Sequence, residues 1–89
     1  MHAEKKKIET LLKTARGQID GILKMVEEDR YCVDICNQIM ATTSILKKAN
    51  LEILDAHIRG CVHDAFENGN SEEKLEEVIQ LISKISKNS

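Results

Sequence analysis

Apolar residues at helical spacing continue without a proline from residue 31 to residue 66 of this 89-residue chain. A helix of ~35 residues would be ~50 Å long, which exceeds the width of a compact domain of this size. Its apolar surface therefore needs a partner along its length, because packing stabilises most protein helices. The pattern predicts a long central helix and, as a consequence, a dimer. The apolar positions are Cys36, Ile39, Met40, Leu46, Ile53, Leu54, His57, Ile58, Cys61, Val62 and Ala65.

Two shorter helices are expected beside the long one, at about residues 4–28 and 71–87. In the first, apolar residues at spacings of three and four are interpreted as one stripe. That stripe consists of Ile8, Leu11, Leu12, Ala15, Ile19, Ile22, Leu23 and Val26. Asn68-Gly69-Asn70 is a turn signal before the last helix. We therefore expect an all-α fold, with a single domain over residues 1–89 and a three-helix protomer.

One alternative is a break in the long helix. Residues 41–44, Ala-Thr-Thr-Ser, and Asn50 are poor helix formers. A helical hairpin at this point would bring Cys32 close to Cys61 within one chain. The two arrangements differ in whether the thiols meet inside a protomer or between protomers.

Cys32, His57 and Cys61 are the strongest candidates for metal ligands. His57 and Cys61 lie one turn apart, whereas Cys32 precedes His57 by 25 residues. In one unbroken helix Cys32 and His57 would be ~37 Å apart and could not meet within a protomer. Antiparallel pairing with a second copy would bring Cys32 beside the other chain's His57 and Cys61, at two equivalent sites. Two thiolates and one imidazole suit a soft metal ion.

Cys36 leaves the composition of this site open. It lies one turn from Cys32, so the four residues could also form a closed zinc site. Cysteine is among the most buried residue types, and simple core packing is the competing explanation for each thiol. His2 and His63 are expected to be surface polar residues.

Composition argues against several classes of protein. No apolar run approaches the ~20 residues that span a membrane, and the charged amino terminus lacks the apolar stretch of a signal peptide. We expect a cytoplasmic protein whose three cysteines stay reduced and available for metal or redox chemistry. No serine–histidine–acid arrangement, glycine-rich phosphate loop or carboxylate pair indicates catalysis. The chain is not expected to be an enzyme.

Charge is unevenly distributed along the chain. The formal net charge of −2 argues against a generally basic nucleic-acid binder. Residues 1–24, however, hold six basic and three acidic side chains, whereas residues 51–89 hold four basic and eight acidic ones. Such asymmetry is ordinary for solvated helix faces. It also fits a basic surface on the first helix that meets phosphates.

From Leu12 to Ile82 the chain resembles the copper-sensing operon repressors, called CsoR-type, within a larger family that also senses nickel or cobalt, formaldehyde and reactive sulfur. The resemblance is carried by the segments 12–22, 31–34, 38–39 and 57–61. It implies a three-helix protomer, an antiparallel dimer and a dimer-of-dimers homotetramer that represses an operator until an effector binds.

The resemblance also implies roles for individual residues. Cu(I) would be held by Cys32 of one protomer and by His57 and Cys61 of the other, with Tyr31 and Glu77 orienting the histidine ring. Operator DNA would be contacted by the basic faces of the first two helices, which here carry Lys13, Arg16, Gln18, Lys47 and Lys48. A copper chaperone is a further candidate partner.

Two positions depart from the family pattern. Leu11 stands where many relatives carry an arginine, so the amino-terminal lysines would have to compensate in DNA contact. Cys36 is not required by the metal triad and could be inert, a fourth ligand or a resolving thiol. It favours a second interpretation, a persulfide-sensing repressor that uses Cys32 and Cys61, although sulfur sensors leave His57 without a task. A third interpretation is a structural zinc-binding helical module without a DNA role.

Overall fold

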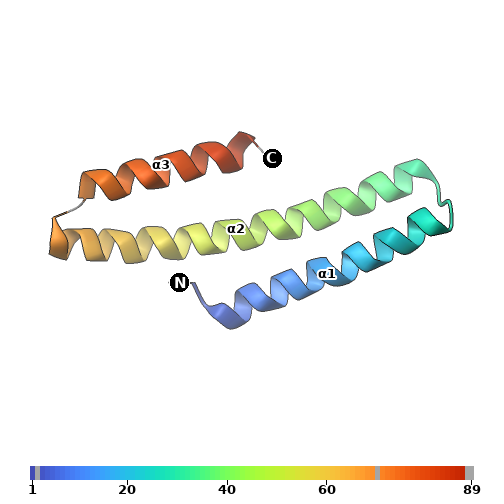
Figure 1. The fold of residues 1–89 in the computed structure, drawn as a ribbon, viewed down its shortest axis with the longest axis horizontal. Helices are drawn as coiled ribbons and strands as arrows, with labels where there is room; N and C mark the ends of the chain where they lie inside the picture. The colour runs from blue at the N-terminus through green and yellow to red at the C-terminus, as the bar shows by residue number, and fades with distance from the viewer. Residues whose placement is uncertain (2, 70, 88–89) are drawn as a thin grey trace.

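The computed structural model describes residues 1, 3–69 and 71–87, except for the side chains of residues 61, 62, 65, 66, 68 and 71. It contains three α-helices: α1 (Lys5–Glu27), α2 (Cys32–Asn68) and α3 (Ser71–Lys87) (Figure 1). Each bound lies within two residues of the expected one. The prediction of an all-α, three-helix protomer with a long second helix is confirmed.

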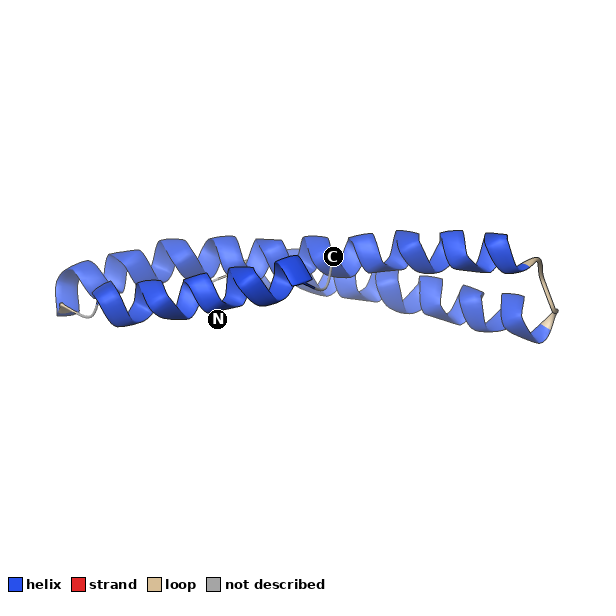
Figure 2. Cartoon of the chain, turned by 90° about the horizontal axis from the view of Figure 1, so that it is seen from above, coloured by secondary structure: helices blue, strands red, loops and turns tan. Residues whose placement is uncertain are grey.

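The three helices form a single layer. α1 lies along one side of α2 and α3 along the other (Figure 1). The protomer measures 56 × 27 × 12 Å, so the layer is thin, and Figure 2 shows its helices offset from one another across that thickness. Because α1 and α3 cover only the edges of α2, the two broad faces of the layer have no cover within the protomer.

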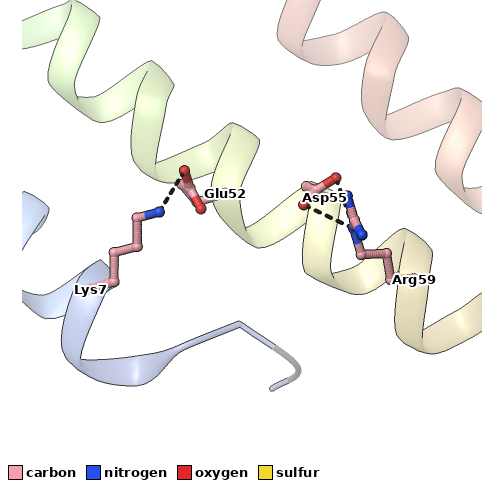
Figure 3. A network of polar contacts seen from close by, with 4 residues as sticks. All are labelled: Lys7, Glu52, Asp55 and Arg59. Atoms are coloured by element: carbon pink, nitrogen blue, oxygen red, sulfur yellow. Dashed lines mark hydrogen bonds and ion pairs between the residues drawn. The ribbon is translucent and has the colours of Figure 1, made fainter.

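α1 packs on α2 along a heptad seam, in which buried and half-buried residues alternate at spacings of three and four. The seam contains Ile8, Leu11, Ala15, Gln18, Ile22 and Met25 of α1 and Ile35, Gln38, Thr42, Ile45, Ala49, Glu52 and Ala56 of α2. Two polar contacts join the helices across it. The Thr42 hydroxyl donates to Gln18 Oε1 at 2.7 Å, and Lys7 Nζ lies 3.1 Å from Glu52 Oε1 (Figure 3). These contacts fix the antiparallel register.

The expected single apolar stripe on α1 is two stripes. Ile8, Leu11, Ala15 and Ile22 face α2 in the seam. A second set lies ~80° further around the helix and is 45–57% exposed. It consists of Leu12, Ile19, Leu23 and Val26. α1 therefore has one apolar side that packs on α2 and another that is exposed.

α2 is continuous, so the helical hairpin considered from the sequence is wrong. Residues 41–44 are helical throughout. The hydroxyls of Thr43 and Ser44 donate to the carbonyl oxygens of Ile39 and Met40, four residues earlier, at 3.0 and 3.1 Å. These hydrogen bonds satisfy the two hydroxyl groups within the helix, so Thr43 and Ser44 are accommodated without a break.

Tight turns return α1 and α3 alongside α2. At the end of α1 the amides of Asp29 and Arg30 donate to the carbonyls of Val26 and Met25, which is a Schellman motif with Asp29 at φ 51°. Gly69, at φ 76°, occupies the left-handed region between α2 and α3, where a side chain would be strained.

The core of the protomer is small. The buried apolar residues among those described are Ile8, Ala15, Ala49, Leu54 and Val78, and Thr42 is buried beside them. Many large apolar side chains are 39–65% exposed on all three helices. No helix in the described part of the chain is long and apolar enough to cross a membrane. The described part of the protomer therefore leaves large apolar side chains on its surface.

Candidate functional site

One broad face of the layer carries the predicted metal ligands of α2, and we call it the thiol face. At ~100° per residue, its α2 residues share an arc of ~100°, roughly 100° around the helix from the seam with α1. They are Cys32, Cys36, Ile39, Leu46, Ile53 and His57. The second apolar stripe of α1 turns to the same face, because α1 and α2 are antiparallel and the two stripes are displaced from the seam in the same rotational sense.

Cys32 and Cys36 are both free and exposed. They lie one turn apart at the amino-terminal end of α2, outside the seam with α1. Core packing within the protomer therefore does not account for either thiol. Cys61 lies in α2, but its side chain is outside the described residues.

His57 lines a pocket of about 210 Å³ between α2 and α3. The pocket is lined by Asn50, Ile53, Leu54, His57, Glu77, Leu81 and Ile85. The structure thus brings His57 and Glu77 to one cavity from different helices. Glu77 also has Lys74 Nζ at 3.8 Å from its Oε2 atom, one turn earlier on α3.

The predicted ligands do not meet within one protomer. Cys32 begins α2, and the continuous helix places His57 25 residues, ~37 Å, away. Tyr31, which is 69% exposed, precedes Cys32 at the same distant end. Among the described residues, no group of three His, Cys, Asp or Glu side chains could hold a metal ion. Any site that uses both ends of α2 is incomplete without a second chain.

The predicted DNA-contacting cations are separated within the protomer. Lys13, Arg16, Lys47 and Lys48 are all exposed. The register set by Gln18 and Thr42 puts Lys13 level with Lys47, but helical spacing turns each away from the other's helix. The two helices therefore do not combine these charges into one patch in a single protomer.

Gln18 lies in the seam between α1 and α2. It is half-buried in the α1–α2 seam, and its Oε1 accepts the hydrogen bond from Thr42. Thr42, only 5% exposed, was not singled out from the sequence. The heptad spacing that Gln18 shares with Ile8 and Ala15 is the signal that could have placed it in the seam.

The two remaining histidines are His63 and His2. His63 is exposed, with its Nε2 atom 3.5 Å from Glu67 Oε1 on the next turn. This agrees with its expected place on the surface. His2 lies outside the described residues.

Comparison with known proteins gives consistent matches over nearly the whole chain. A family model described as metal-sensitive transcriptional repressor matches residues 4–84. The chain is 42% identical over 84 residues to the copper-sensing transcriptional repressor CsoR of Bacillus subtilis (strain 168), covering 94% of this chain and 83% of that protein. It is 40% identical over 80 residues to CsoR of Mycobacterium tuberculosis (strain ATCC 25618 / H37Rv), covering 90% and 67%.

Solved structures show the same arrangement of helices. The nickel-responsive transcriptional regulator InrS matches with a TM-score of 0.82 and 28% identity, covering 96% of each chain. The copper-sensing repressor CsoR with Cu(I), from Geobacillus thermodenitrificans NG80-2, matches with a TM-score of 0.82 and 35% identity, covering 97% of this chain and 93% of that one. The fold alone therefore does not separate a copper sensor from a nickel sensor.

Proposed function

Because this chain belongs to the CsoR-type, metal-sensitive transcriptional repressor family, we propose that it is a Cu(I)-responsive repressor with a metal site shared between two protomers. Its family consists of repressors rather than enzymes, and repression implies binding to operator DNA. The apo protein would hold the operator and Cu(I) would release it. The family assignment removes the alternative of a zinc module with no role in transcription.

The observation that carries the proposal is the position of Cys32 and His57 on one face of an unbroken α2, ~37 Å apart. Two ligands so placed can meet only if a second α2 runs antiparallel across the thiol face. That face is also where α1 leaves its second apolar stripe uncovered. Covering it with a second copy would satisfy the metal ligands and bury the exposed apolar side chains together.

The apolar residues of the thiol face favour one register for this pairing. Ile39, Leu46 and Ile53 recur every seven residues and fall between Cys32 and Gly60. With Leu46 at the two-fold axis, Ile39 of each chain would oppose Ile53 of the other. Cys32 would then oppose Gly60, which His57 and Cys61 flank. The same pairing that matches apolar side chains would thus assemble two equivalent metal sites.

The donor set favours Cu(I) over Ni(II). Thiolate sulfur selects soft Cu(I), whereas Ni(II) prefers tetragonal sites richer in nitrogen or oxygen. A bound copper ion would supply the bonds that tie Cys32 of one α2 to the α2–α3 region of the other. Glu77, which shares the pocket of His57, would hold the ring through its second nitrogen. Tyr31 would approach the same ring from the partner chain, together with Cys32.

For DNA contact we propose the exposed cations Lys13, Arg16, Lys47 and Lys48, with Gln18 contributing through its amide nitrogen. Lys5, Lys6 and Lys7 support a phosphate-binding role for α1. They form its first turn, where positive charge is unfavourable to the helix macrodipole. No acidic residue lies in that turn, although Lys7 is ion-paired with Glu52 of α2. Positive charge at this position destabilises the helix, but it would interact favourably with a polyanion such as DNA.

A tetramer follows as a second proposal about assembly. The residues Leu75, Ile79 and Ile82 are 45–60% exposed along α3. Helical spacing turns them to the face opposite the thiol face, where pairing through α2 would leave them uncovered. We assign this stripe to contact between two dimers.

A persulfide-sensing repressor is the second candidate, favoured by the two exposed thiols one turn apart. His57→Ala distinguishes the two functions, because it removes a metal ligand and leaves Cys32 and Cys36 in place. We expect His57→Ala protein to bind its promoter fragment but to stay bound when stoichiometric Cu(I) is added. Release of His57→Ala by copper would contradict the proposed switch. Release of wild-type protein by persulfide donors, but not by copper, would establish the sulfur sensor instead.

A further inference from the structure

We propose that Cys36 is a fourth donor of the shared metal site, which then holds a tetrahedral divalent ion such as Zn(II) as well as Cu(I). The inference rests on the proposed antiparallel pairing of α2. It assigns a task to a residue that the three-ligand copper site does not use.

Cys36 has the exposure and position that such a donor needs. Its thiol is exposed, and it follows Cys32 by one turn, ~6 Å along α2 and ~40° around it. Both thiols lie on the thiol face, whereas the seam with α1 uses Ile35 and Gln38 instead. The chain therefore presents two thiols side by side to whatever covers this face.

The register favoured by Leu46 brings Cys36 close to the partner's histidine. If Leu46 lies at the two-fold axis, Cys36 is level with Ala56 of the second copy, one residue or ~1.5 Å from the level of His57. Cys32 is ~4.5 Å from that level, but only ~1.5 Å from the level of Cys61. Along the helix axes Cys36 is thus better placed than Cys32 to approach His57.

The resulting set is three thiols and one imidazole, arranged as two pairs. Cys32 with the second copy's Cys61 would form one pair, and Cys36 with its His57 the other, separated by about one helical turn. Structural zinc sites use this Cys₃His composition in tetrahedral geometry. A soft monovalent ion is satisfied by fewer ligands, so Cys36 would distinguish a divalent metal from Cu(I) at one site.

Co(II) is a suitable probe, because Zn(II) has no d–d spectrum and Co(II) adopts the same tetrahedral geometry. The intensity of the thiolate-to-cobalt charge-transfer band reports how many thiolates bind. We expect Cys36→Ala to lose about one third of the wild-type intensity, since three thiolates become two. Its Zn(II) affinity should fall at least about tenfold, because even an outer partner of a metal ligand contributes that much. Its Cu(I) affinity should not change.

Thr43→Ala is the matched control, because Thr43 is exposed, lies between Cys36 and Leu46 on the same face and has no metal-binding side chain. Cys36→Ser repeats the test with a side chain of nearly unchanged size. Wild-type charge-transfer intensity in both Cys36 variants would overturn the proposal. If those variants look like wild type but Cys32→Ala loses the band, only the fourth donor is wrong. If Cys32→Ala also keeps it, the shared site itself is wrong.

Discussion

The hydrogen bond between Thr42 and Gln18 is a single-residue contact that sets how α1 is shifted along α2. Both side chains occupy seam positions that would otherwise be apolar, and Thr42 is 5% exposed. A polar pair inside a heptad seam specifies register at some cost in stability. The positions of Lys13 and Arg16 relative to α2 therefore depend on a hydrogen bond between two neutral side chains inside the seam.

Thr42→Val tests this contact, because it keeps the branched shape and removes the hydroxyl. Gln18 Oε1 would then lie in the seam without its donor, and we expect a loss of ~1–2 kcal/mol in the free energy of unfolding. Thr10→Val is the control, since the exposed Thr10 hydroxyl only donates to the Lys6 carbonyl of its own helix. Urea unfolding followed by circular dichroism measures both variants. Equal losses of unfolding free energy in the two variants would show that the hydrogen bond between Thr42 and Gln18 stabilises the protein no more than a bond within one helix.

The helices and the candidate metal ligands could be proposed from the sequence. Which neighbouring helix each side chain contacts could not. Periodicity identified the helices because apolar spacing reports helical structure directly. It merged Leu11 and Leu12 into one stripe, although the first faces α2 and the second is 47% exposed. Likewise, a polar side chain such as Gln18 gives no sequence signal that it contacts another helix. Only the packing of the helices shows which of these side chains face α2 and which are exposed.

At the scale of helices, α2 carries three functions on different sides. One side packs on α1, a second presents the thiol face and a third borders α3 at the pocket of His57 and Glu77. Lys47 and Lys48 lie on the rest of the α2 surface, and their side chains are ~100° apart around the helix. Because α2 is a single continuous helix, metal bound at the proposed ligands Cys32 and His57 would be able to alter the position of these lysines.

The salt dependence of operator binding tests whether Lys47 and Lys48 meet phosphates. Each lost phosphate contact should reduce the magnitude of the slope of log K against log salt by about 1 per protomer. We expect this reduction, with weaker binding to all sequences, in Lys47→Ala/Lys48→Ala. Lys84→Ala/Lys87→Ala removes the same charge from the end of α3 and serves as the control. An unchanged slope in the α2 variant would exclude both lysines from the interface.

At the scale of the whole molecule, the proposed function needs more than one protomer. A thin layer of three helices buries a handful of apolar residues, leaves its broad faces apolar and holds Cys32 and His57, the proposed metal ligands, 25 residues apart on α2. Each feature is unfavourable or useless in isolation. Pairing of two copies through the thiol face would remove all three problems, and copper would then act on the dimer rather than on a protomer.

Subunit mixing tests this claim most directly. Cys32→Ala protomers and His57→Ala/Cys61→Ala protomers each lack ligands at both sites of their own dimers. A mixed dimer, however, has one complete site, formed by Cys32 of the second variant and by His57 and Cys61 of the first. We predict that mixing the two by unfolding and refolding together restores tight Cu(I) binding, at one ion per mixed dimer, measured by competition with a coloured chelator. A mixture that binds no more Cu(I) than either parent would contradict a site shared between chains.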